Sequence, residues 1–278
     1  MRFSSDQIQK IGKEISSKVD GKTLFDEFSR GRYSTDASVY QIKPLGVVLP
    51  KDTDDVLNLM EYSQKNSIPL LARGGGSSQC GQTVGESVVL DYSKHQNKIL
   101  ELNVEEKYVW VQPGVVLDHL NSFLRPYGLW FPVDVSTSSR ATIGGMSANN
   151  SCGSRSLYYG NMVHNVLAIE AILDDGSLHT FDQINKNYLT TTNNQDRFYK
   201  IIDKFLNLRQ KVSKDIDENW PTTQRRVGGY NIDLIDPNGF NSSNLLVGSE
   251  GTLSLFNKIK LQLSCLLYTS DAADDCWS

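Results

Sequence analysis

The apolar pattern of the chain is sharpest between residues 47 and 72. An apolar run at 47–49 predicts a strand, and Asp52 after it is a good helix N-cap. Apolar positions then recur every three to four residues until Asn66, which predicts an amphipathic helix. The apolar run at 68–72 predicts a second, buried strand. Together these patterns predict a β-α-β unit.

Short apolar runs separated by turn residues dominate the rest of the chain, which is typical of a β-rich region. Asp175-Gly176 between two such runs predicts a hairpin, because this pair tolerates the positive φ angles of a tight turn. Helical spacing of apolar residues predicts two further helices, at 116–124 and 197–212. The predicted strands are 88–90, 99–104, 108–111, 166–173, 178–181, 245–247 and 253–263.

The two ends of the chain carry weaker patterns. Residues 1–38 are mostly polar, with isoleucines at helical spacing, and we predict an N-terminal arm that lies on a domain spanning 39–263. Residues 264–278 abandon the strand pattern, and their string LLYTSDAADD resembles a translated adaptor sequence. We therefore predict that 264–278 is a non-native tail, with a genuine acidic tail as the alternative.

Composition and charge narrow the class of partner. The 278 residues are 39% hydrophobic, which is enough for an ordinary globular core. The 28 basic residues are scattered among 32 acidic ones, so we expect a small-molecule partner and no nucleic acid. No apolar run approaches the roughly 18 residues of a transmembrane segment, and the start of the chain is too polar for a secretory signal. We expect a cytoplasmic protein, with peripheral attachment to a membrane as an alternative.

The cysteines and histidines do not form a metal-binding pattern. The cysteines stand too far apart for a zinc or iron–sulfur spacing, and no two histidines form an i,i+4 pair or an HExxH motif. We therefore predict free thiols and no metal site. The residues concerned are Cys80, Cys152, Cys265, Cys276, His95, His119, His164 and His179.

The strongest chemical signal is the stretch RGGGSSQCGQ at 73–82, directly after the strand predicted at 68–72. Three consecutive glycines can adopt dihedral angles closed to other residues and let backbone N–H groups approach an anion such as a pyrophosphate. The stretch lacks the Lys-Ser/Thr of a P-loop and the GxGxxG spacing of a Rossmann site. Taken alone, the glycine triplet is also compatible with a plain flexible turn.

Four further segments of small residues, glycine and proline accompany this loop. Each lies at the end of a predicted element, which is what several loops need when they approach a flat aromatic ligand. Ordinary tight turns account for any one of these segments but poorly for all four. The segments are Val111 to Gly114, Phe131 to Ser138, Ala141 to Met146 and Ala148 to Gly153.

Five motifs follow one another between residues 33 and 263: RGGGSSQCGQ, VQPGVVLDHLN, FPVDVSTSSRATIGGMSANNSCG, YGNMVHNV and LLVGSEGTL. In this order they resemble the PCMH-type FAD-binding domain of the vanillyl-alcohol oxidase family of flavoproteins. Within that family they are most similar to the branch of D-lactate dehydrogenase, glycolate oxidase and D-2-hydroxyglutarate dehydrogenase. RYSTDASVYQ and QRRVGGYN extend the likeness to large bacterial members that fuse this module to an iron–sulfur domain.

The resemblance implies an α+β fold, the PCMH-type FAD-binding fold of two α/β subdomains with FAD between them. No histidine stands in the glycine loop, so the resemblance implies a non-covalently held flavin. Ser254 replaces a glycine that many relatives have, which puts close backbone contact there in doubt. The cofactor-binding residues that the resemblance implies are Arg73, Gly74, Gly75, Gly76, Ser77, Ser78, Gln79, Asp134, Ser136, Thr137, Ser138, Thr142, Ile143, Gly144, Gly145, Asn149, Asn150, Ser151, Cys152, Glu250, Gly251, Thr252 and Leu253.

The same resemblance implies a chemistry. In this branch a hydride passes from the α-carbon of a 2-hydroxy acid to flavin N5, while a base takes the hydroxyl proton and cations hold the carboxylate. In the family those groups lie in a substrate domain that follows the FAD domain. We therefore expect this chain to be a truncated form, inactive alone, with its catalytic residues and any iron–sulfur cluster in the missing C-terminal region.

Two alternatives to a 2-hydroxy-acid dehydrogenase remain open at this point. The first is an FAD-linked oxidase or transferase that acts on another substrate, such as an alcohol, a sugar lactone or an ether lipid. The second is a nucleotide-binding module without redox activity. The sequence does not indicate the electron acceptor.

Overall fold

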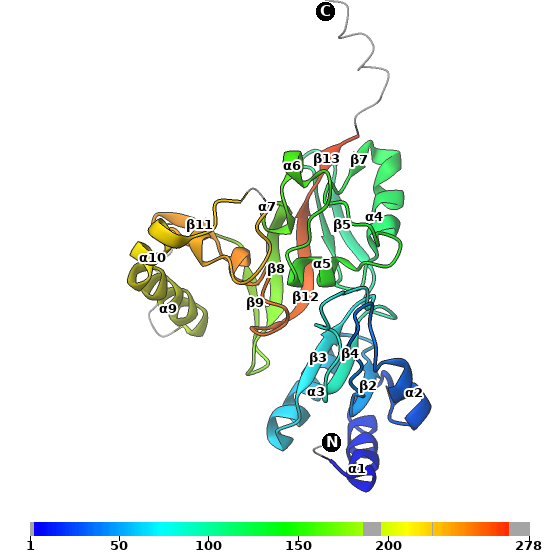
Figure 1. Ribbon diagram of the computed structural model, residues 1–278. Helices are drawn as coiled ribbons and strands as arrows, with labels where there is room; N and C mark the ends of the chain where they lie inside the picture. Colours follow the sequence, from blue (N-terminus) through cyan, green and yellow to red (C-terminus); the bar gives the residue numbers. More distant parts are fainter. Residues whose placement is uncertain (1–2, 186–195, 224, 267–278) are drawn as a thin grey trace, which may run out of the picture.

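The computed structural model describes residues 3–185, 196–223 and 225–266 of the chain. Its N-terminal subdomain contains a four-stranded sheet in which β2 and β3 run parallel to β4, while β1 runs antiparallel to β2 (Figure 1). In their order across the sheet, the strands are β1 (Lys22–Leu24), β2 (Gly46–Leu49), β4 (Val88–Asp91) and β3 (Leu70–Arg73).

The predicted β-α-β unit is confirmed, because α3 (Thr53–Asn66) connects β2 to β3. The side chain of Asp52 caps the helix by accepting a hydrogen bond from the backbone N–H of Asp55 at 3.1 Å. β4 lies between the two strands of the unit, so three parallel strands end at the same edge of the sheet. In open α/β sheets, ligands bind outside such carboxyl ends.

The segment predicted as an N-terminal arm supplies part of this subdomain. α1 (Ser5–Ser16) places Ile8 and Ile15 in the same buried cluster as Val48 of β2. β1 also lies in this segment, as does α2 (Glu27–Arg32). Isoleucines at helical spacing form a continuous apolar face, and that face packs onto the sheet. The domain limit at residue 38 stays a prediction.

The second subdomain contains a five-stranded antiparallel sheet with β12 (Leu255–Gln262) at its centre. β5 (Ile99–Asn103) and β6 (Tyr108–Val111) lie on one side of it, and β8 (Val166–Ile172) and β9 (Leu178–Phe181) lie on the other. These five strand predictions are confirmed. The predicted hairpin between β8 and β9 is confirmed too, and its Gly176 has a φ of 81°.

Short helices cover this second sheet and share its core. Buried residues of α4 (Leu117–Leu124), α5 (Ile143–Ala148) and α7 (Met162–Asn165) belong to the same apolar cluster as the sheet. Figure 1 shows α5 close to the junction of the two subdomains. Around the far end of the sheet lie η1 (Arg125–Tyr127), β7 (Leu129–Trp130), α6 (Ser156–Tyr159) and β13 (Ser264–Cys265).

β13 belongs to the segment that we predicted as a non-native tail. It pairs with β7, and the backbone N–H of Leu266 donates to the carbonyl of Gly128 at 2.8 Å. The rest of that segment, 267–278, lies outside the described residues. The prediction for the tail as a whole stays open.

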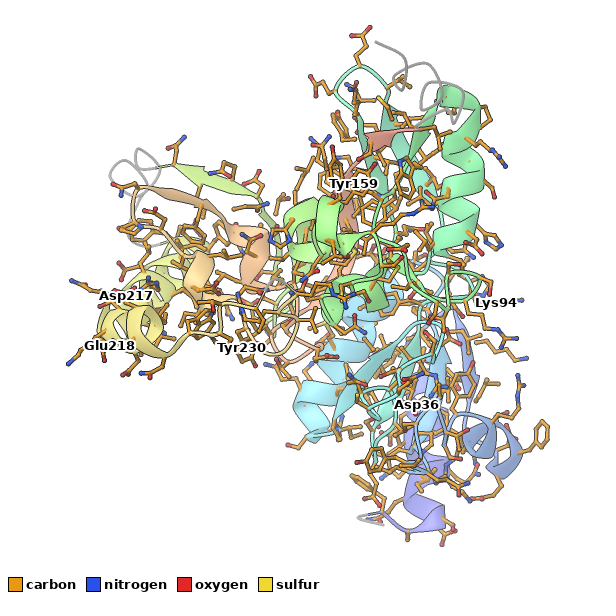
Figure 2. The ribbon with its side chains drawn as sticks, turned by 45° about the horizontal axis from the view of Figure 1, so that its top comes forward. Asp36, Lys94, Tyr159, Asp217, Glu218 and Tyr230 are labelled. Carbon is orange, nitrogen blue, oxygen red and sulfur yellow. The ribbon has the colours of Figure 1, made fainter. Side chains whose placement is uncertain are left out.

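An extension projects from the side of the second subdomain (Figure 1). The predicted helix at 197–212 is confirmed as α9. Figure 2 shows Asp217 and Glu218 at the outer edge of this extension, where both are exposed. Its elements are β10 (Gln183–Asn185), α9 (Arg197–Lys211), α10 (Ser213–Asn219), η2 (Ile232–Leu234) and β11 (Gly239–Asn241).

The strand predicted at 245–247 is wrong. Leu245 ends a 3-10 turn, η3 (Ser242–Leu245), and Leu246 and Val247 follow it. The side chain of Asn241 caps this turn by accepting a hydrogen bond from the Ser243 backbone N–H at 3.0 Å. The backbone N–H of Val247 donates to the carbonyl of Ser243 at 3.0 Å, which is a helical and not a strand bond. A short apolar run is buried in either conformation, so its pattern alone does not separate them.

Candidate cofactor-binding site

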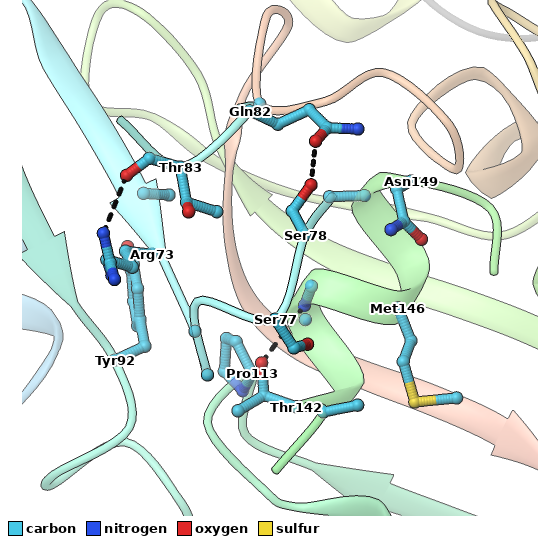
Figure 3. Close-up of a pocket in the computed structure, with 18 of the residues that line it drawn as sticks. Arg73, Ser77, Ser78, Gln82, Thr83, Tyr92, Pro113, Thr142, Met146 and Asn149 are labelled. Atoms are coloured by element: carbon cyan, nitrogen blue, oxygen red, sulfur yellow. Dashed lines mark hydrogen bonds between the residues drawn. The ribbon is translucent and has the colours of Figure 1, made fainter. Parts of the chain in front are cut away.

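A cavity of about 180 Å³ lies between the two subdomains (Figure 3). One wall is the glycine loop that follows β3, which we call the first wall (Arg73 to Thr83). The second wall comes from the other subdomain and combines α5 and its flanks with the segment that leads into β12. Two of the motif groups found in the sequence, far apart along the chain, therefore meet in space.

The glycines of the first wall are required by contacts within the protein. A Cβ on Gly74 would lie 2.0 Å from the Thr142 Oγ1 atom, and one on Gly75 would lie 2.2 Å from the carbonyl oxygen of Arg140. Gly76 has a φ of 63°, in the left-handed region that favours glycine. The sequence pattern predicted glycines that make room for a ligand, whereas the structure shows that they also let the two walls touch.

The guanidinium group of Arg73 stabilises the first wall through hydrogen bonds. This group donates to the carbonyls of Thr35 at 2.8 Å, Thr83 at 3.0 Å and Tyr33 at 3.3 Å, and it also stacks on the ring of Tyr33. Burial lowers the pKa of Arg73 from its ordinary value. The bond to Thr83 joins the two ends of the glycine loop (Figure 3), and the bonds to Tyr33 and Thr35 hold the loop against the segment that follows α2.

Thr142 anchors the second wall at the start of α5. Its side chain accepts a hydrogen bond from the Gly145 backbone N–H at 3.4 Å, and its backbone bridges to Val116. Gly144 faces Pro113, where an added Cβ would lie 2.6 Å from the proline Cβ. These contacts explain why small residues and proline recur in segments that are distant in sequence: they pack on one another around the cavity.

Polar side chains connect the two walls at the cavity edge. The Gln82 Nε2 atom donates to Glu250 Oε1 at 3.4 Å, and Ser78 donates to the side-chain oxygen of Gln82 (Figure 3). Partial burial raises the pKa of Glu250. Its backbone has a φ of 53°, between two glycines that also have positive φ, Gly248 and Gly251. This turn brings a carboxyl group from the second subdomain to the glycine loop of the first.

The stretch after α5 divides between the cavity and the core. Asn149 and Ser151 line the cavity. Asn150, between them, is fully buried and accepts a hydrogen bond from the Val163 backbone N–H at 3.0 Å. The Asp134 carboxylate holds the next turn by accepting from Ser154 Oγ at 2.7 Å and from the Arg155 backbone N–H at 3.0 Å. Asn150 and Asp134 therefore position this wall.

The predicted site residues fall into two groups. One group lines the cavity: Arg73, Gly74, Gly75, Gly76, Ser77, Ser78, Thr137, Thr142, Gly144, Gly145, Asn149, Ser151, Glu250 and Gly251. The other group is not among the cavity-lining residues of the described chain: Gln79, Asp134, Ser136, Ser138, Ile143, Asn150, Cys152, Thr252 and Leu253.

Sequence reasoning missed several residues that line the cavity. Most of them stand within or beside the quoted motifs, and proximity to those motifs was the available signal. Tyr92 stands in no motif, and no sequence signal pointed to it. The missed residues are Ala72, Gln82, Thr83, Tyr92, Pro113, Ala141, Met146, Ala148 and Phe256. Val135, Ser254 and Leu255 also line the cavity, and they stand within the stretches Asp134 to Ser138 and Glu250 to Leu255, which the resemblance implies as FAD-contacting.

The residues that line the cavity suit a polar cofactor. The glycines of the first wall leave backbone N–H groups open to an anion such as a pyrophosphate. The hydroxyl-bearing residues Ser77, Ser78 and Thr137 also line the cavity. This lining fits a nucleotide that bears a flavin.

His164 does not provide a catalytic base. His164 Nδ1 accepts a hydrogen bond from the Asn161 backbone N–H at 3.0 Å, and burial together with Arg226 lowers the pKa of His164. In a neutral imidazole whose Nδ1 accepts, the proton lies on Nε2. His164 can thus donate from its remaining nitrogen but cannot accept a proton there.

The described residues include no cluster of side chains that could bind a metal ion, and their cysteines are free. No group of three or more His, Cys, Asp or Glu that could hold a metal ion occurs among these residues. Cys80, Cys152 and Cys265 are free thiols, and Cys276 lies outside the described residues. Nor does any helix in this part of the chain have the length and apolar character needed to cross a bilayer.

Comparison with known proteins agrees with the geometry. The family model described as FAD binding domain matches residues 44–182, which is half of the chain. The D-2-hydroxyglutarate dehydrogenase of Haemophilus influenzae is 37% identical over 246 residues, which cover 83% of this chain and 23% of that protein. The glycolate oxidase subunit GlcD of Bacillus subtilis is 35% identical over 175 residues, 62% of this chain and 37% of that protein.

Solved structures show the same fold. An alkyldihydroxyacetonephosphate synthase superposes with a TM-score of 0.64 at 18% identity, covering 92% of this chain and 40% of that one. The predicted fold, a PCMH-type FAD-binding fold of mixed helices and sheets, is confirmed. The chain spans about a quarter of the length of the D-2-hydroxyglutarate dehydrogenases that it matches. With its matched domain, its fold and its polar cavity, the chain belongs to the FAD binding domain family.

Proposed function

We propose that this chain is the FAD-binding portion of an FAD-dependent oxidoreductase that oxidises a 2-hydroxy acid. The observation that carries the proposal is the similarity to proteins named D-2-hydroxyglutarate dehydrogenase over 83% or more of this chain. The relatives named glycolate oxidase subunit GlcD and D-lactate dehydrogenase support it, because their named substrates also carry a hydroxyl beside a carboxylate. D-2-hydroxyglutarate is the first substrate to test.

The chemistry divides between the cofactor and the protein. The flavin, when bound, supplies the acceptor for a hydride from the substrate α-carbon. The chain itself binds and orients this cofactor: we propose that the predicted residues lining the cavity contact FAD, and that Asp134, Asn150 and Ile143 hold those residues in place. Ile143 is fully buried at the start of α5, which suits such a supporting role.

We propose that FAD is held without a covalent bond. The glycine loop from Arg73 to Gln82 contains no histidine, and Cys152 is not among the cavity-lining residues described above. Acid precipitation of the flavin-loaded protein would then leave the flavin in the supernatant. A yellow pellet would show a covalent link, and mass spectrometry of its peptides would identify the attached residue.

We infer that the substrate base and the carboxylate-binding cations come from outside the matched region. His164 cannot accept a proton at Nε2, and the D-2-hydroxyglutarate dehydrogenases named above are about four times as long as this chain. The electron acceptor is not identified, and an iron–sulfur cluster would lie in that other region. A cytoplasmic location, with peripheral membrane attachment as the alternative, stays a prediction that cell fractionation would test.

Anaerobic mixing experiments test the proposed reaction. The protein encoded by the complete open reading frame that includes this chain would be loaded with FAD. It would then be mixed with D-2-hydroxyglutarate, D-lactate or glycolate while the flavin absorbance band at about 450 nm is followed. Bleaching by one of these acids within seconds is the expected result. FAD bound at full occupancy with no bleaching by any 2-hydroxy acid would contradict the proposal and favour a substrate of another class.

A further inference from the structure

A short hairpin follows α2 and contacts the glycine loop. An isolated antiparallel bridge pairs Thr35 with Gln41 and closes this hairpin, which we call the 33–42 hairpin. It contains most of the stretch RYSTDASVYQ, which carries part of the family resemblance but has no role in the site described so far. The structure describes all residues of the hairpin, and none of them is among those that line the cavity.

The Asp36 carboxylate joins this hairpin to the end of the glycine loop. Its Oδ2 atom accepts a hydrogen bond from Thr83 Oγ1 at 3.0 Å, and its Oδ1 atom accepts one from the Ser38 backbone N–H at 2.8 Å. Figure 2 shows Asp36 in the first subdomain. Burial disfavours the charged form of Asp36, but hydrogen bonds from Ser38 and Thr83 outweigh it and lower its pKa. An ionised acceptor makes both hydrogen bonds stronger than neutral ones.

Tyr40 covers the neighbouring position of the loop. Gly81 has a φ of 81°, in the left-handed region that favours glycine, and an added Cβ there would lie 2.6 Å from Tyr40 Cδ2. The ring therefore packs directly on the loop backbone, although 54% of the residue is exposed. Gln82 lies between the two contacted positions, lines the cavity and donates to Glu250 of the second wall.

The composition of the glycine loop makes it costly to order. Four of the eight residues from 74 to 81 are glycines, and glycine loses more backbone freedom on ordering than any other residue. A ligand that must order a loop binds more weakly by the free energy of that ordering. Arg73 holds the start of the loop against the 33–42 hairpin, while Asp36 and Tyr40 hold its end against the same hairpin.

We propose that Asp36 and Tyr40 are positioning residues that hold the end of the glycine loop in the conformation that binds FAD. They act through Thr83 and Gly81 and do not contact the cofactor. When either contact is lost, FAD has to order the loop, so its affinity falls while the core stays folded. The proposal rests on the proposed binding of FAD in the cavity and not on the identity of the substrate.

Asp36→Ala in the 278-residue chain tests the first contact. The dissociation constant for FAD would rise about 3- to 10-fold, measured by quenching of flavin fluorescence, because the hydrogen bond from Thr83 is lost. Asp36→Asn keeps an acceptor oxygen and would recover most of the affinity. Hydrogen exchange, measured by mass spectrometry on the apoprotein, would be faster in the alanine variant for the peptide that contains 77–83, and saturating FAD would slow it again.

A double-mutant cycle shows whether Asp36 acts through Thr83. Thr83→Val removes the hydroxyl donor and keeps the shape of the side chain. In the Thr83→Val background, Asp36→Ala would change FAD affinity less than about twofold, because the hydrogen bond is already absent. A loss as large as in the unmodified background would overturn the assigned route.

Tyr40 is tested by its ring. Tyr40→Ala would weaken FAD binding about 2- to 5-fold because the packing on Gly81 is lost, whereas Tyr40→Phe keeps the ring and would bind FAD as the unmodified protein does. Equal losses in the two Tyr40 variants would contradict a role for ring packing.

Asp236→Ala is the matched control. Asp236 Oδ1 accepts a hydrogen bond from the Asn238 backbone N–H at 2.7 Å, as Asp36 does from Ser38, but Asp236 lies in the extension of the second subdomain. This variant would leave FAD affinity and exchange in 77–83 unchanged. Unchanged affinity and exchange in both Asp36→Ala and Tyr40→Ala would overturn the proposal. An unmodified protein without affinity for FAD would overturn the proposed function as well, so the two failures are distinguishable.

Discussion

The two walls of the cavity are built in different ways. The first wall is one continuous loop of about ten residues that follows a parallel strand, as ligand loops do in open α/β sheets. The second wall is assembled from segments that are up to about 140 residues apart, from Pro113 to Ser254 and beyond, on an antiparallel sheet. A continuous loop can be recognised in the sequence as a motif. The composition of an assembled wall depends on which distant segments the fold brings together. Substitutions in each wall, and in the core that supports it, distinguish the two ways of building a wall.

The largest effect is expected from Gly75→Val in the first wall. Even a Cβ at this position would lie 2.2 Å from the Arg140 carbonyl oxygen, and a branched side chain adds further clashes. The variant would lose bound flavin after purification and unfold at a lower temperature, because the glycine loop can no longer touch the second wall. Flavin absorbance and thermal melting measure both effects.

Gly31→Ala is the control for that variant, since an added Cβ at Gly31 would meet nothing within 4 Å. It would keep flavin binding and melting temperature unchanged or slightly raise the latter, because alanine favours the helix α2. Normal flavin content in Gly75→Val would show that the first wall does not depend on this close contact.

A smaller effect, on stability alone, is expected from Ile15→Ala in α1. Ile15 is fully buried in the cluster beneath the first sheet, so its truncation would lower the free energy of unfolding by about 2 to 5 kcal/mol. Chemical denaturation measures the change. Ile42→Ala, at a position 38% exposed, would cost much less. Equal effects of the two would mean that residues 1–38 are not part of the core on which the first wall rests.

Asp134→Ala tests how the second wall is supported. The change removes the acceptor for Ser154 Oγ and for the Arg155 backbone N–H, and would cost about 1 to 2 kcal/mol of stability. FAD affinity would fall a few-fold because the turn after Ser151 is less well held. Asp134→Asn keeps one acceptor oxygen and would recover part of both losses. If alanine and asparagine variants both match the unmodified protein, the turn is held by other contacts.

The smallest effect is expected at the polar contact between the walls. The pKa of Glu250 is raised by burial, so its folded-state carboxyl takes up a proton at higher pH than in the unfolded chain. Above that raised pKa the carboxylate is charged, and its burial lowers the stability of the folded state. As the pH falls through the raised pKa, the carboxyl group is protonated and this cost is lost. FAD carries a pyrophosphate anion into the same cavity, so protonation of Glu250 would strengthen FAD binding.

We expect the dissociation constant for FAD to fall about two- to threefold between roughly pH 8 and pH 5. Glu250→Gln would bind FAD with the low-pH affinity throughout, while Glu101→Gln, at an exposed position of β5, would keep the pH dependence of the unmodified protein. A pH dependence that persists in Glu250→Gln would assign the titration to another group.

Part of the site could be predicted because its residues form a motif that neighbouring residues are enough to identify. The loop from Arg73 to Gln82 combines a preceding strand with three glycines, and both features are readable within about fifteen residues. Thr142 and the glycines after it were likewise implied by a motif. Tyr92 was not, because nothing in the neighbouring sequence distinguishes a tyrosine in a core from one that lines a cavity.

The errors in the fold have a similar origin. Residues 245–247 are apolar and buried, yet they form the end of a 3-10 turn and the residues just after it. The hydrogen bonds around Ser243 decide the backbone conformation there, and burial does not. The isoleucines of α1 were identified as helical, but their spacing does not say what the helix packs against. Packing depends on the sheet strands around β2, which lie about thirty residues later.

The sequence by itself determined every strand of the two larger sheets except β1, the N-cap and limits of α3, and the glycine loop, since each depends on a few neighbouring residues. Only the tertiary structure decided that Gly75 faces Arg140, that Glu250 reaches Gln82, and that Tyr92 and Ser254 line one cavity. The physical reason is that close approach and burial are properties of segments brought together from distant parts of the chain, and no local pattern encodes which segments those are.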